Sequence, residues 1–329
     1  MSAPAKIDAI GANLAARLPG RVERGVPSAG LTTYRCGGSL AVVVRAESDD
    51  DLRAVAGVVR PAEVPLLVIG RGSNLLVDDD GFAGVALVLA GEFEQLDVQA
   101  IDSSADPAAP GAPVRAGGAV PLPVLARRSA AAGVTGLEFF VGIPGSVGGA
   151  VRMNAGGHGA QTADVILSAR VFDLGDARFR DVSRGELGLA YRRSALSLQS
   201  VVVAATFSGG RDTPAACAER IDEIVRWRRE HQPGGQNAGS VFTNPPGDSA
   251  GRLIEAAGGK GMRVGGAVVS QKHANFFVAE PGARATDVYD LIEIVRRRVY
   301  ESSGVQLETE LHLVGFGHRS GARTNAEAS

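Results

Sequence analysis

The chain has 329 residues and a formal net charge of −2, and 45% of its residues are hydrophobic while 21% are charged. This composition is ordinary for a protein with an apolar core, and the length is enough for two domains. The low net charge excludes a global field that would attract nucleic acid or an anionic membrane. The only two cysteines, Cys36 and Cys217, lie far apart, so we expect free thiols in a reducing compartment.

The N-terminal segment predicts an amphipathic helix over about residues 5–18, because Ile7, Ile10, Leu14 and Leu18 recur at helical spacing. It has no continuous apolar core of the kind found in a signal peptide. No run of about 18 apolar residues occurs in the sequence, so we expect no membrane insertion and a cytoplasmic protein.

Three short apolar runs early in the chain predict strands at residues 41–46, 66–69 and 85–89. A helix is predicted between the first two strands, with Ser48 as its cap and Asp51 at the capping-box position. Its buried face would carry Leu52, Val55, Ala56 and Val59. This order is a β-α-β unit, which favours parallel pairing of its strands.

The middle of the chain predicts a surface loop at residues 102–113 and then a helix that Pro121 and Pro123 open and Gly133 ends. Strands are predicted at residues 165–172 and 201–207, with a turn at 173–176 after the first strand. A helix follows at residues 214–230. We expect the first domain to end at residue 213.

The C-terminal part predicts a smaller α/β domain over residues 214–316, followed by a polar, disordered tail at 317–329. Ser249 is expected to cap a short helix and Thr286 a long one. The buried face of the long helix would carry Val288, Leu291, Ile292, Val295 and Val299. Strands are predicted at 275–279 and 305–314, with Leu307 and Leu311 on one face of the last strand and Glu308 and Glu310 on the other.

Gly70-Arg71-Gly72-Ser73-Asn74 forms a first glycine-rich loop after a predicted strand. It lacks the third glycine and the following helix of a dinucleotide fingerprint, and it also lacks the lysine of a Walker loop. Its successive backbone N–H groups could form an anion-binding nest, with Ser73 and Asn74 as further donors. Taken alone, an ordinary tight turn is the simpler interpretation.

A second loop, at residues 142–159, contains seven glycines within eighteen residues. It reads Gly142-Ile143-Pro144-Gly145-Ser146-Val147-Gly148-Gly149, followed by Asn154-Ala155-Gly156. Each glycine costs conformational entropy on folding. We therefore favour a ligand packed on bare backbone over a merely irregular loop.

Ser240, Arg192 and Glu310 are the polar candidates for chemistry. Ser240 lacks the Gly-x-Ser-x-Gly elbow of a hydrolase nucleophile, so a hydrogen-bond or proton donor is the better hypothesis. Taken one by one, a turn serine, a solvated arginine pair and a solvated glutamate are the ordinary interpretations. The histidines lack metal-ligand spacing, so we predict no metal site.

Taken together and in order, these segments resemble the UDP-N-acetylenolpyruvoylglucosamine reductases (MurB family) of bacterial wall synthesis. The resemblance rests on Thr33-Tyr34-Arg35-Cys36-Gly37-Gly38, the two glycine loops, Tyr191-Arg192-x-Ser194, Gly239-Ser240-Val241-Phe242-x-Asn244-Pro245 and Leu307-Glu308-x-Glu310. It spans roughly residues 30–316 and is closer to the shorter type II branch. The chain departs from the family pattern at Gly157-His158, where Ala-Tyr is frequent, and at Cys36, which looks structural.

The resemblance implies an α+β / α/β fold, with a FAD-binding domain of the vanillyl-alcohol-oxidase (PCMH) type, in two subdomains, at residues 1–213 and a C-terminal substrate domain. It implies FAD and NADPH as cofactors. The implied reaction reduces the enolpyruvyl ether of UDP-N-acetylglucosamine enolpyruvate to UDP-N-acetylmuramate for peptidoglycan synthesis. A monomer acting on a nucleotide sugar is expected.

The same resemblance implies a role for each motif residue. Arg192 would polarise the substrate carboxylate with help from Glu310, and Ser240 would give the proton. Tyr191 and Asn244 would contact the substrate. The implied cofactor-binding residues are Gly70, Arg71, Gly72, Ser73, Asn74, Leu75, Gly142, Ile143, Pro144, Gly145, Ser146, Gly148, Gly149, Asn154 and Gly156.

Two other functions remain possible on the sequence. A sugar or alcohol oxidase of the same fold would commonly tether its flavin through a histidine or cysteine, and the first loop has neither. A nucleotide-sugar-binding regulator without catalysis would have no need of Ser240, Arg192 and Glu310 together.

Overall fold

The structure is a computed structural model that describes residues 3–98 and 113–318. Most of the loop predicted at 102–113, and the predicted tail from residue 319 onward, lie outside the described residues. The chain divides into two compact units that interleave in sequence. The first comprises Met1–Glu23, Val43–Arg71 and Val85–Glu230, and the second comprises Arg24–Val42, Gly72–Gly84 and His231–Ser329.

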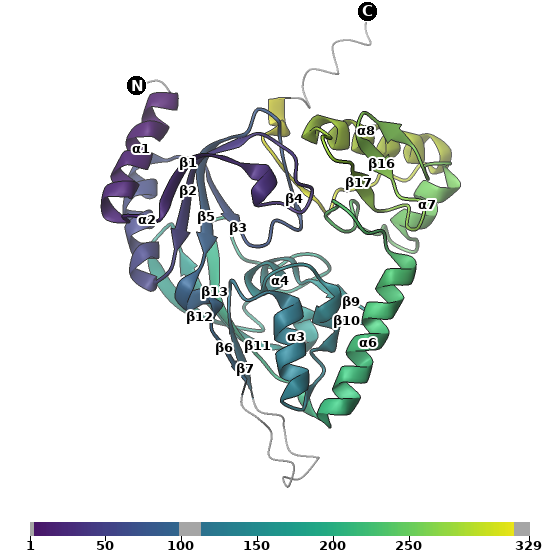
Figure 1. The fold of residues 1–329 in the computed structure, drawn as a ribbon, viewed down its shortest axis with the longest axis horizontal. Helices are drawn as coiled ribbons and strands as arrows, with labels where there is room; N and C mark the ends of the chain where they lie inside the picture. The colour runs from purple at the N-terminus through teal and green to yellow at the C-terminus, as the bar shows by residue number, and fades with distance from the viewer. Residues whose placement is uncertain (1–2, 99–112, 319–329) are drawn as a thin grey trace, which may run out of the picture. The chain divides into compact units, whose positions relative to one another are not determined.

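Two helices of the first unit, α1 (Ala3–Arg17) and α2 (Asp49–Ala62), lie side by side (Figure 1). The apolar stripe predicted for α1 is buried, as is the one predicted for α2. Ser48 Oγ accepts a hydrogen bond from the N–H of Asp51 at 3.3 Å, and the Asp51 carboxylate accepts one from the N–H of Ser48 at 3.1 Å. The predicted capping box is therefore confirmed.

The first sheet has the strand order β1-β2-β5-β3. Its strands are β1 (Val22–Pro27), β2 (Ser39–Ala46), β3 (Leu66–Ile69) and β5 (Phe82–Leu89). β3 pairs in parallel with β5, with Leu66 opposite Val85. The expectation that β2 and β3 pair directly is wrong, because β5 lies between them. Val85, Ala86 and Leu87 are fully buried, and such a strand requires a central place in the sheet.

The second sheet is antiparallel, with the order β12-β11-β13-β7-β6. Its strands are β6 (Leu96–Val98), β7 (Val114–Gly117), β11 (Ile166–Asp173), β12 (Arg178–Ser183) and β13 (Ser200–Phe207). The strands predicted at 165–172 and 201–207 are confirmed. β12 was not predicted, although its turn was: Asp173 Oδ1 accepts a hydrogen bond from the N–H of Gly175 at 2.8 Å.

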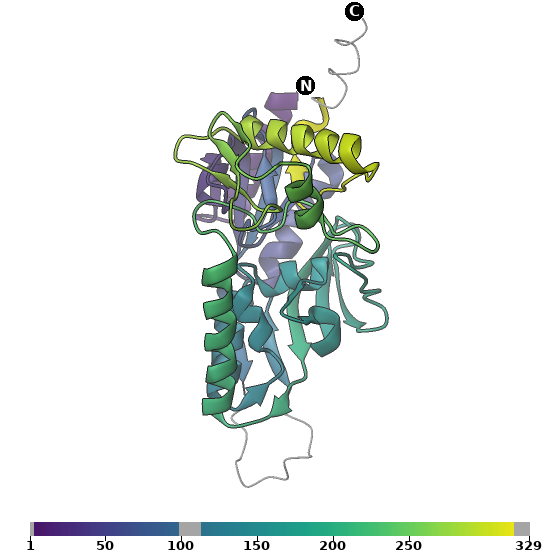
Figure 2. The ribbon, with the colours of Figure 1, turned by 90° about the vertical axis from the view of Figure 1, so that its right-hand side faces the viewer.

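Helices α3 (Leu122–Ala131) and α6 (Pro214–His231) confirm two predicted helices (Figures 1 and 2). The sequence placed the second of them at the start of the C-terminal domain, whereas its residues up to Glu230 belong to the first unit. Gly133 follows α3 with a φ of +76°, which explains why the helix stops there. The remaining short elements of this unit are η2 (Gly91–Glu94), β8 (Val134–Thr135), η3 (Glu138–Gly142), α4 (Val147–Met153), β9 (Gly156–Gly157), β10 (Ala160–Gln161), α5 (Thr162–Val165) and β14 (Gly210–Arg211).

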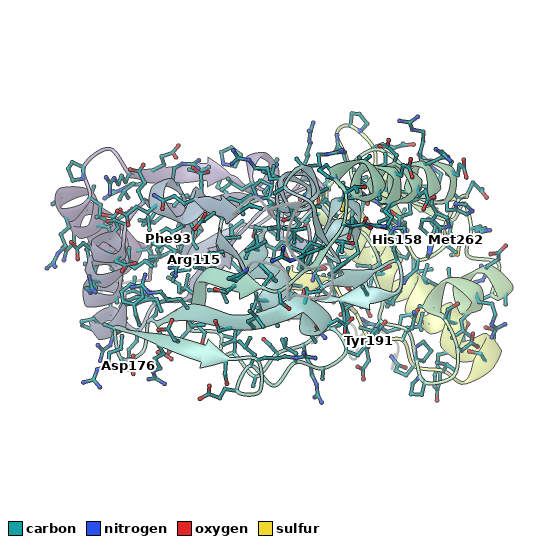
Figure 3. The ribbon with its side chains drawn as sticks, turned by 90° about the horizontal axis from the view of Figure 1, so that it is seen from below. Phe93, Arg115, His158, Asp176, Tyr191 and Met262 are labelled. Atoms are coloured by element: carbon teal, nitrogen blue, oxygen red, sulfur yellow. The ribbon has the colours of Figure 1, made fainter. Side chains whose placement is uncertain are left out.

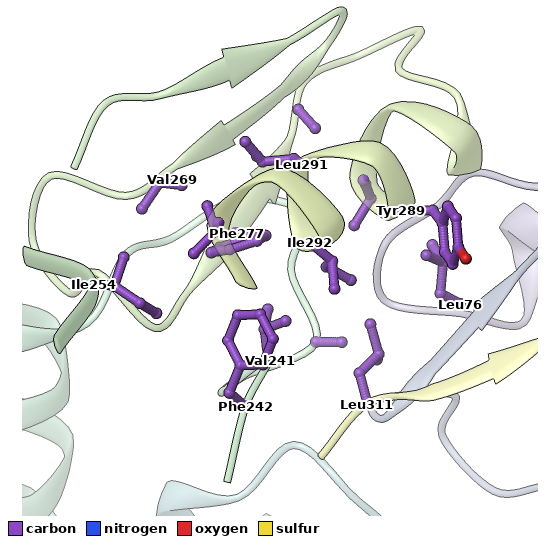
Figure 4. Packing of buried hydrophobic residues seen from close by; sticks show 14 of the residues in the cluster. Leu76, Val241, Phe242, Ile254, Val269, Phe277, Tyr289, Leu291, Ile292 and Leu311 are labelled. Carbon is purple, nitrogen blue, oxygen red and sulfur yellow. The ribbon is translucent and has the colours of Figure 1, made fainter. Parts of the chain in front are cut away.

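The second unit is built around helix α8 (Ala285–Ser303). The five apolar residues predicted on its buried face are fully buried, and Leu291 and Ile292 face a cluster that includes Val241, Phe242 and Phe277 (Figure 4). The other elements are η1 (Ser28–Gly30), β4 (Leu75–Val77), α7 (Ala250–Ala256), β15 (Arg263–Val264), β16 (Ala267–Val269), β17 (Phe277–Ala279), β18 (His312–Val314) and η4 (Phe316–His318).

Three predictions for this unit are corrected by the structure. Thr286 is not the cap of α8, because the Asp79 carboxylate accepts hydrogen bonds from the N–H groups of Ala285 and Thr286, both at 3.0 Å, and the helix begins earlier. The strand predicted at 305–314 is shortened to β18, which pairs in parallel with β4. The strand predicted at 275–279 is shortened to β17, because the N–H of Phe276 donates to the carbonyl of His273 at 3.0 Å in a turn just before it.

Among the helices of the described residues, none combines the length and the apolar character that a membrane span requires.

Candidate active site

The first glycine loop joins β3 to β4, and its residue Gly70 lies against the second loop within the first unit. A Cβ atom on Gly70 would lie closer to Ser146 Oγ than van der Waals contact allows. No backbone carbonyl within the described residues accepts a hydrogen bond from the N–H of Gly70, Arg71 or Ser73. These N–H groups are therefore available to a ligand.

Gly72 and Asn74 contact the protein itself, within the second unit. Gly72 has a φ of +59°, and a Cβ atom there would overlap the backbone of Leu31 and Thr32. Asn74 Nδ2 donates a hydrogen bond to the carbonyl of Glu310 at 3.0 Å, and Asn74 accepts one from the N–H of His312 at 3.1 Å. Leu75 then opens β4.

The second glycine loop leads from η3 through Ile143, Pro144 and Gly145 into α4, for which Ser146 is the N-cap. The first N–H groups of α4 are already committed. Val147 donates to the carbonyl of Val120 at 3.0 Å, and Gly148 donates to that of Gly118 at 2.8 Å. Donors for an anion must therefore come from the loop before the helix rather than from the helix end.

Gly148 and Gly149 are glycines for different reasons. A Cβ atom on Gly148 would lie 3.1 Å from the carbonyl oxygens of Gly118 and Val202, so the helix packs tightly on backbone there. A Cβ atom on Gly149 would meet only Ser146 Oγ, at 3.6 Å, which is ordinary contact. Glycine within a helix costs about 1 kcal/mol relative to alanine, and no contact of a Cβ atom within the described chain explains it at position 149.

The Gly157-His158 departure from the family pattern lies near the end of this loop. His158 has a φ of +54°, and its ring lies edge-on to Trp227, with 4.9 Å between the ring centroids. A Cβ atom on Gly142 would lie 3.1 Å from His158 Cδ2. Burial, followed by the nearby charge of Arg228, lowers the pKa of His158. His158 therefore packs directly on the first residue of the second loop.

Tyr191 and Arg192 lie at the tip of a tight turn between Ala190 and Arg193. Tyr191, labelled in Figure 3, is 53% exposed, and the Arg192 guanidinium carbon lies 5.2 Å from the centre of its ring. Arg192 Nη2 donates a hydrogen bond to the carbonyl of Gly156 at 3.3 Å. The exposed ring and the tethered guanidinium would suit contacts with an anionic substrate.

In the second unit, Ser240 lies on an extended segment that pairs with the chain at Phe276 on one side and at Thr309 on the other. Ser240 forms an antiparallel bridge with Phe276, and Phe242 forms one with Thr309. The N–H of Glu310 donates to the carbonyl of Val241 at 2.8 Å. The structure therefore brings the Ser240 and Glu310 segments together.

Asn275 was not singled out from the sequence, yet it holds the segment that carries Ser240. Its carbonyl accepts a hydrogen bond from Val241 at 2.9 Å. Its side chain accepts one from the N–H of Phe242 at 3.0 Å and donates one to the carbonyl of Phe242 at 2.8 Å. Asn275 is only 2% exposed, so these bonds fix the segment in the core. No local sequence pattern marks this contact.

Asn244, the predicted substrate contact, accepts a hydrogen bond at Oδ1 from the N–H of Ala250 at 3.0 Å, at the start of α7. Both cysteines are free and buried, and burial, followed by Asp79 and Asp287, raises the pKa of Cys36 to about 12. In residues 3–98 and 113–318, no group of three or more His, Cys, Asp or Glu side chains could hold a metal ion.

Two family profiles match the chain. Residues 40–183 match the profile described as "FAD binding domain", and residues 231–314 match "UDP-N-acetylenolpyruvoylglucosamine reductase, C-terminal domain". The fold and its glycine loops thus define a FAD-binding oxidoreductase with a smaller C-terminal domain. The predicted fold class is confirmed.

Several proteins are similar over nearly the whole length. The UDP-N-acetylenolpyruvoylglucosamine reductase of Paramagnetospirillum magneticum is 43% identical over 302 residues, covering 91% of this chain and 94% of the relative. That of Methylorubrum populi is 39% identical over 323 residues, covering 98% and 100%. The crystal structure of the Thermus caldophilus reductase matches with a TM-score of 0.74 at 37% identity, covering 89% of this chain and 99% of that one. The chain belongs to the UDP-N-acetylenolpyruvoylglucosamine reductase family.

Proposed function

We propose that the chain catalyses the FAD-dependent reduction of the enolpyruvyl ether of UDP-N-acetylglucosamine enolpyruvate to UDP-N-acetylmuramate, with NADPH as reductant, in peptidoglycan precursor synthesis. The observation that carries the proposal is family membership over 91% of the chain. The bare backbone at Gly149 supports it independently, because a Cβ atom at position 149 would make only ordinary contact with the described chain.

The glycine loops fit the diphosphate of FAD. The N–H groups of Gly70 and Arg71 have no backbone acceptor among the described residues. The oxygens of a bound anion would accept hydrogen bonds from these groups. The space next to Gly149 can hold part of the cofactor, which a side chain at this position would exclude. Gly142, Ile143, Pro144, Gly145 and Ser146 continue the same loop, and we assign them to the cofactor with it.

The bound flavin would supply the chemistry that carries a hydride from NADPH to the vinyl methylene carbon of the substrate. As the hydride arrives, negative charge builds on the pyruvyl carboxylate. Arg192 stabilises that charge where it develops, with Glu310 assisting. Ser240 Oγ then gives its proton to the adjacent carbon. We assign Tyr191 and Asn244 to substrate binding.

We further propose that the protein acts as a monomer in the cytoplasm. The two free, buried thiols support a reducing compartment. Size-exclusion chromatography with light scattering tests the oligomeric state, because a mass twice that of the chain would contradict it.

The reaction is tested by following the two half-reactions separately in a stopped-flow instrument. In Ser240→Ala, reduction of the flavin by NADPH should keep its rate, while reoxidation by the enolpyruvyl substrate should slow by about 10²–10⁴-fold. Ser302→Ala, a change of the same kind on α8, should affect neither step. Equal slowing of both steps in Ser240→Ala would show that Ser240 is structural.

The same assay separates the two other functions. Steady oxidation of a free sugar with oxygen would indicate an oxidase. Ligand binding without turnover would indicate a regulator. NADPH oxidation that requires the enolpyruvyl nucleotide sugar is the result we expect.

The FAD assignment is tested by Gly149→Val and Gly145→Val. Both variants should fold but lose bound FAD. At position 149 a Cβ atom makes only ordinary contact with the chain, 3.6 Å from Ser146 Oγ, so we expect the added side chain to clash with the ligand. Gly185→Val is the matched control, since a Cβ atom on Gly185 has no neighbour within 4 Å. A fully loaded, yellow Gly149→Val protein would refute the assignment.

A further inference from the structure

The turn that carries Arg192 is held in a strained conformation. The N–H of Ala190 donates to the carbonyl of Arg193 at 3.0 Å, and the N–H of Arg193 donates to that of Ala190 at 3.1 Å. Arg192 has a φ of +56°. This left-handed conformation costs a residue other than glycine about 1–2 kcal/mol. Such strain persists only where surrounding contacts enforce it, and it is common at functional sites.

Asn154, at the C-terminal cap of α4, supplies one of those contacts. Its Nδ2 donates to the carbonyl of Ala190 at 3.0 Å and to Gln161 Oε1 at 3.0 Å. Its Oδ1 accepts a hydrogen bond from the N–H of Ala163 at 2.8 Å. The residue is 1% exposed, so its amide is committed inside the protein and cannot reach a cofactor.

Two further hydrogen bonds tie the same turn to the last turn of α4 and to β9, which follows it. Arg192 Nη2 donates to the carbonyl of Gly156, and Ser194 Oγ donates to the carbonyl of Arg152 at 2.8 Å. The N-terminal end of α4 begins at Ser146, which lies against Gly70. One seven-residue helix thus has a cofactor loop at one end and the Arg192 turn at the other.

We propose that Asn154 is a positioning residue for Arg192 rather than a ligand of the cofactor. The inference rests on the proposed function, in which Arg192 meets the substrate carboxylate. Asparagine suits the position for two reasons. It tolerates the left-handed conformation at φ +42°, and its amide offers both the donor for Ala190 and the acceptor for Ala163.

The test is Asn154→Asp, which keeps the shape and the acceptor for Ala163 but loses the donor to Ala190. Flavin content and flavin reduction by NADPH should stay close to those of the unmodified protein. The thermal midpoint should fall, because the new carboxylate is buried against the oxygens of Ala190 and Gln161. Reoxidation by the enolpyruvyl substrate should slow by roughly ten- to a hundredfold, because small misplacements of a reacting group cost that much. Gln161→Ala, which removes the other partner of Nδ2, is the matched control and should leave reoxidation within about twofold.

A double-mutant cycle separates positioning from a merely structural role. If Asn154 acts through Arg192, Asn154→Asp combined with Arg192→Ala should be no slower than Arg192→Ala alone. Multiplying effects would overturn the inference, and so would an unchanged reoxidation rate in Asn154→Asp. Should Arg192→Ala itself reoxidise at the normal rate, the assigned role of Arg192 in the proposed function fails instead.

Two milder variants decide the matter if Asn154→Asp does not fold. Asn154→Gly keeps the left-handed backbone, and Ser194→Ala removes only the Ser194 bond to Arg152. Both should slow reoxidation alone, and neither should add to Arg192→Ala. Additivity in both variants, or normal reoxidation in both, would refute the positioning role.

Discussion

The two units hold their reactive candidates in different ways. In the first, Arg192 lies on a turn that three hydrogen bonds tie to the end of α4 and to β9 just after it. In the second, Ser240 lies on an extended segment that backbone groups and Asn275 bind on both sides. A turn can shift as a whole when a tie is lost, whereas a buried extended segment cannot move without leaving polar groups unpaired. Lost contacts should therefore cost rate in the first unit and stability in the second.

The largest effect expected from this comparison is that of Asn275→Ala. It leaves the N–H and the carbonyl of Phe242 without their partner in the core. At about 1–3 kcal/mol for each unpaired buried group, the free energy of unfolding should fall by about 3 kcal/mol. Urea unfolding, followed by circular dichroism, measures this loss.

Asn237→Ala is the matched control for that variant. Asn237 lies on the segment that carries Ser240. Its side chain forms hydrogen bonds with the nearby backbone of Gly234, Gly235 and Gly239. Its loss should cost under about 1 kcal/mol. If both asparagine variants were destabilised equally, the side chain of Asn275 would have no special part in holding the segment.

A smaller effect is expected when glycine and alanine are compared at positions 192 and 240. The difference in the free energy of unfolding between the two variants should have opposite signs at the two positions. At position 192 the backbone is left-handed, so Arg192→Gly should be more stable than Arg192→Ala by about 1 kcal/mol. At position 240 the backbone forms a strand-like bridge, so Ser240→Ala should be more stable than Ser240→Gly by about 0.5–1 kcal/mol. Thermal unfolding of the four apoproteins provides the ranking. The same sign at both positions would remove the contrast between turn and extended segment.

The helices were predicted well because their signals are local. The stripes of α1, α2 and α8 repeat within a few residues, and Ser48 and Asp51 cap α2 from three positions apart. The errors arose where a partner is distant. Asp79 starts α8 from 206 positions away, and the place of β5 depends on how completely it is buried.

The same distinction between local and distant partners applies to the candidate site. The motifs assign Ser240 and Glu310 to one reaction, and the structure shows that the backbones of their segments are hydrogen-bonded. Asn154 sits in a glycine motif, which suggested a cofactor contact, but its partner Ala190 is 36 positions away. Asn275 reaches Phe242 over 33 positions. Neither pairing leaves a periodic trace in the sequence, so only the fold reveals it.

The smallest effect expected is a pH dependence that separates His158 in the first unit from His273 in the second. Burial is the main cause that lowers the pKa of each histidine, with Arg228 acting on His158 and Lys260 on His273 as further causes. Because the unfolded chain then binds a proton first, both histidines contribute stability above a pH of about 6.5 that is lost as the pH falls.

The fluorescence of Trp227, the only tryptophan, can report the titration of His158. Its ring lies 4.9 Å from the His158 ring, and a charged imidazole there should quench its fluorescence. The quenching midpoint should fall below about pH 6.5, disappear in His158→Gln and persist in His273→Gln. A midpoint unchanged by His158→Gln would show that the fluorescence of Trp227 reports the titration of some group other than His158.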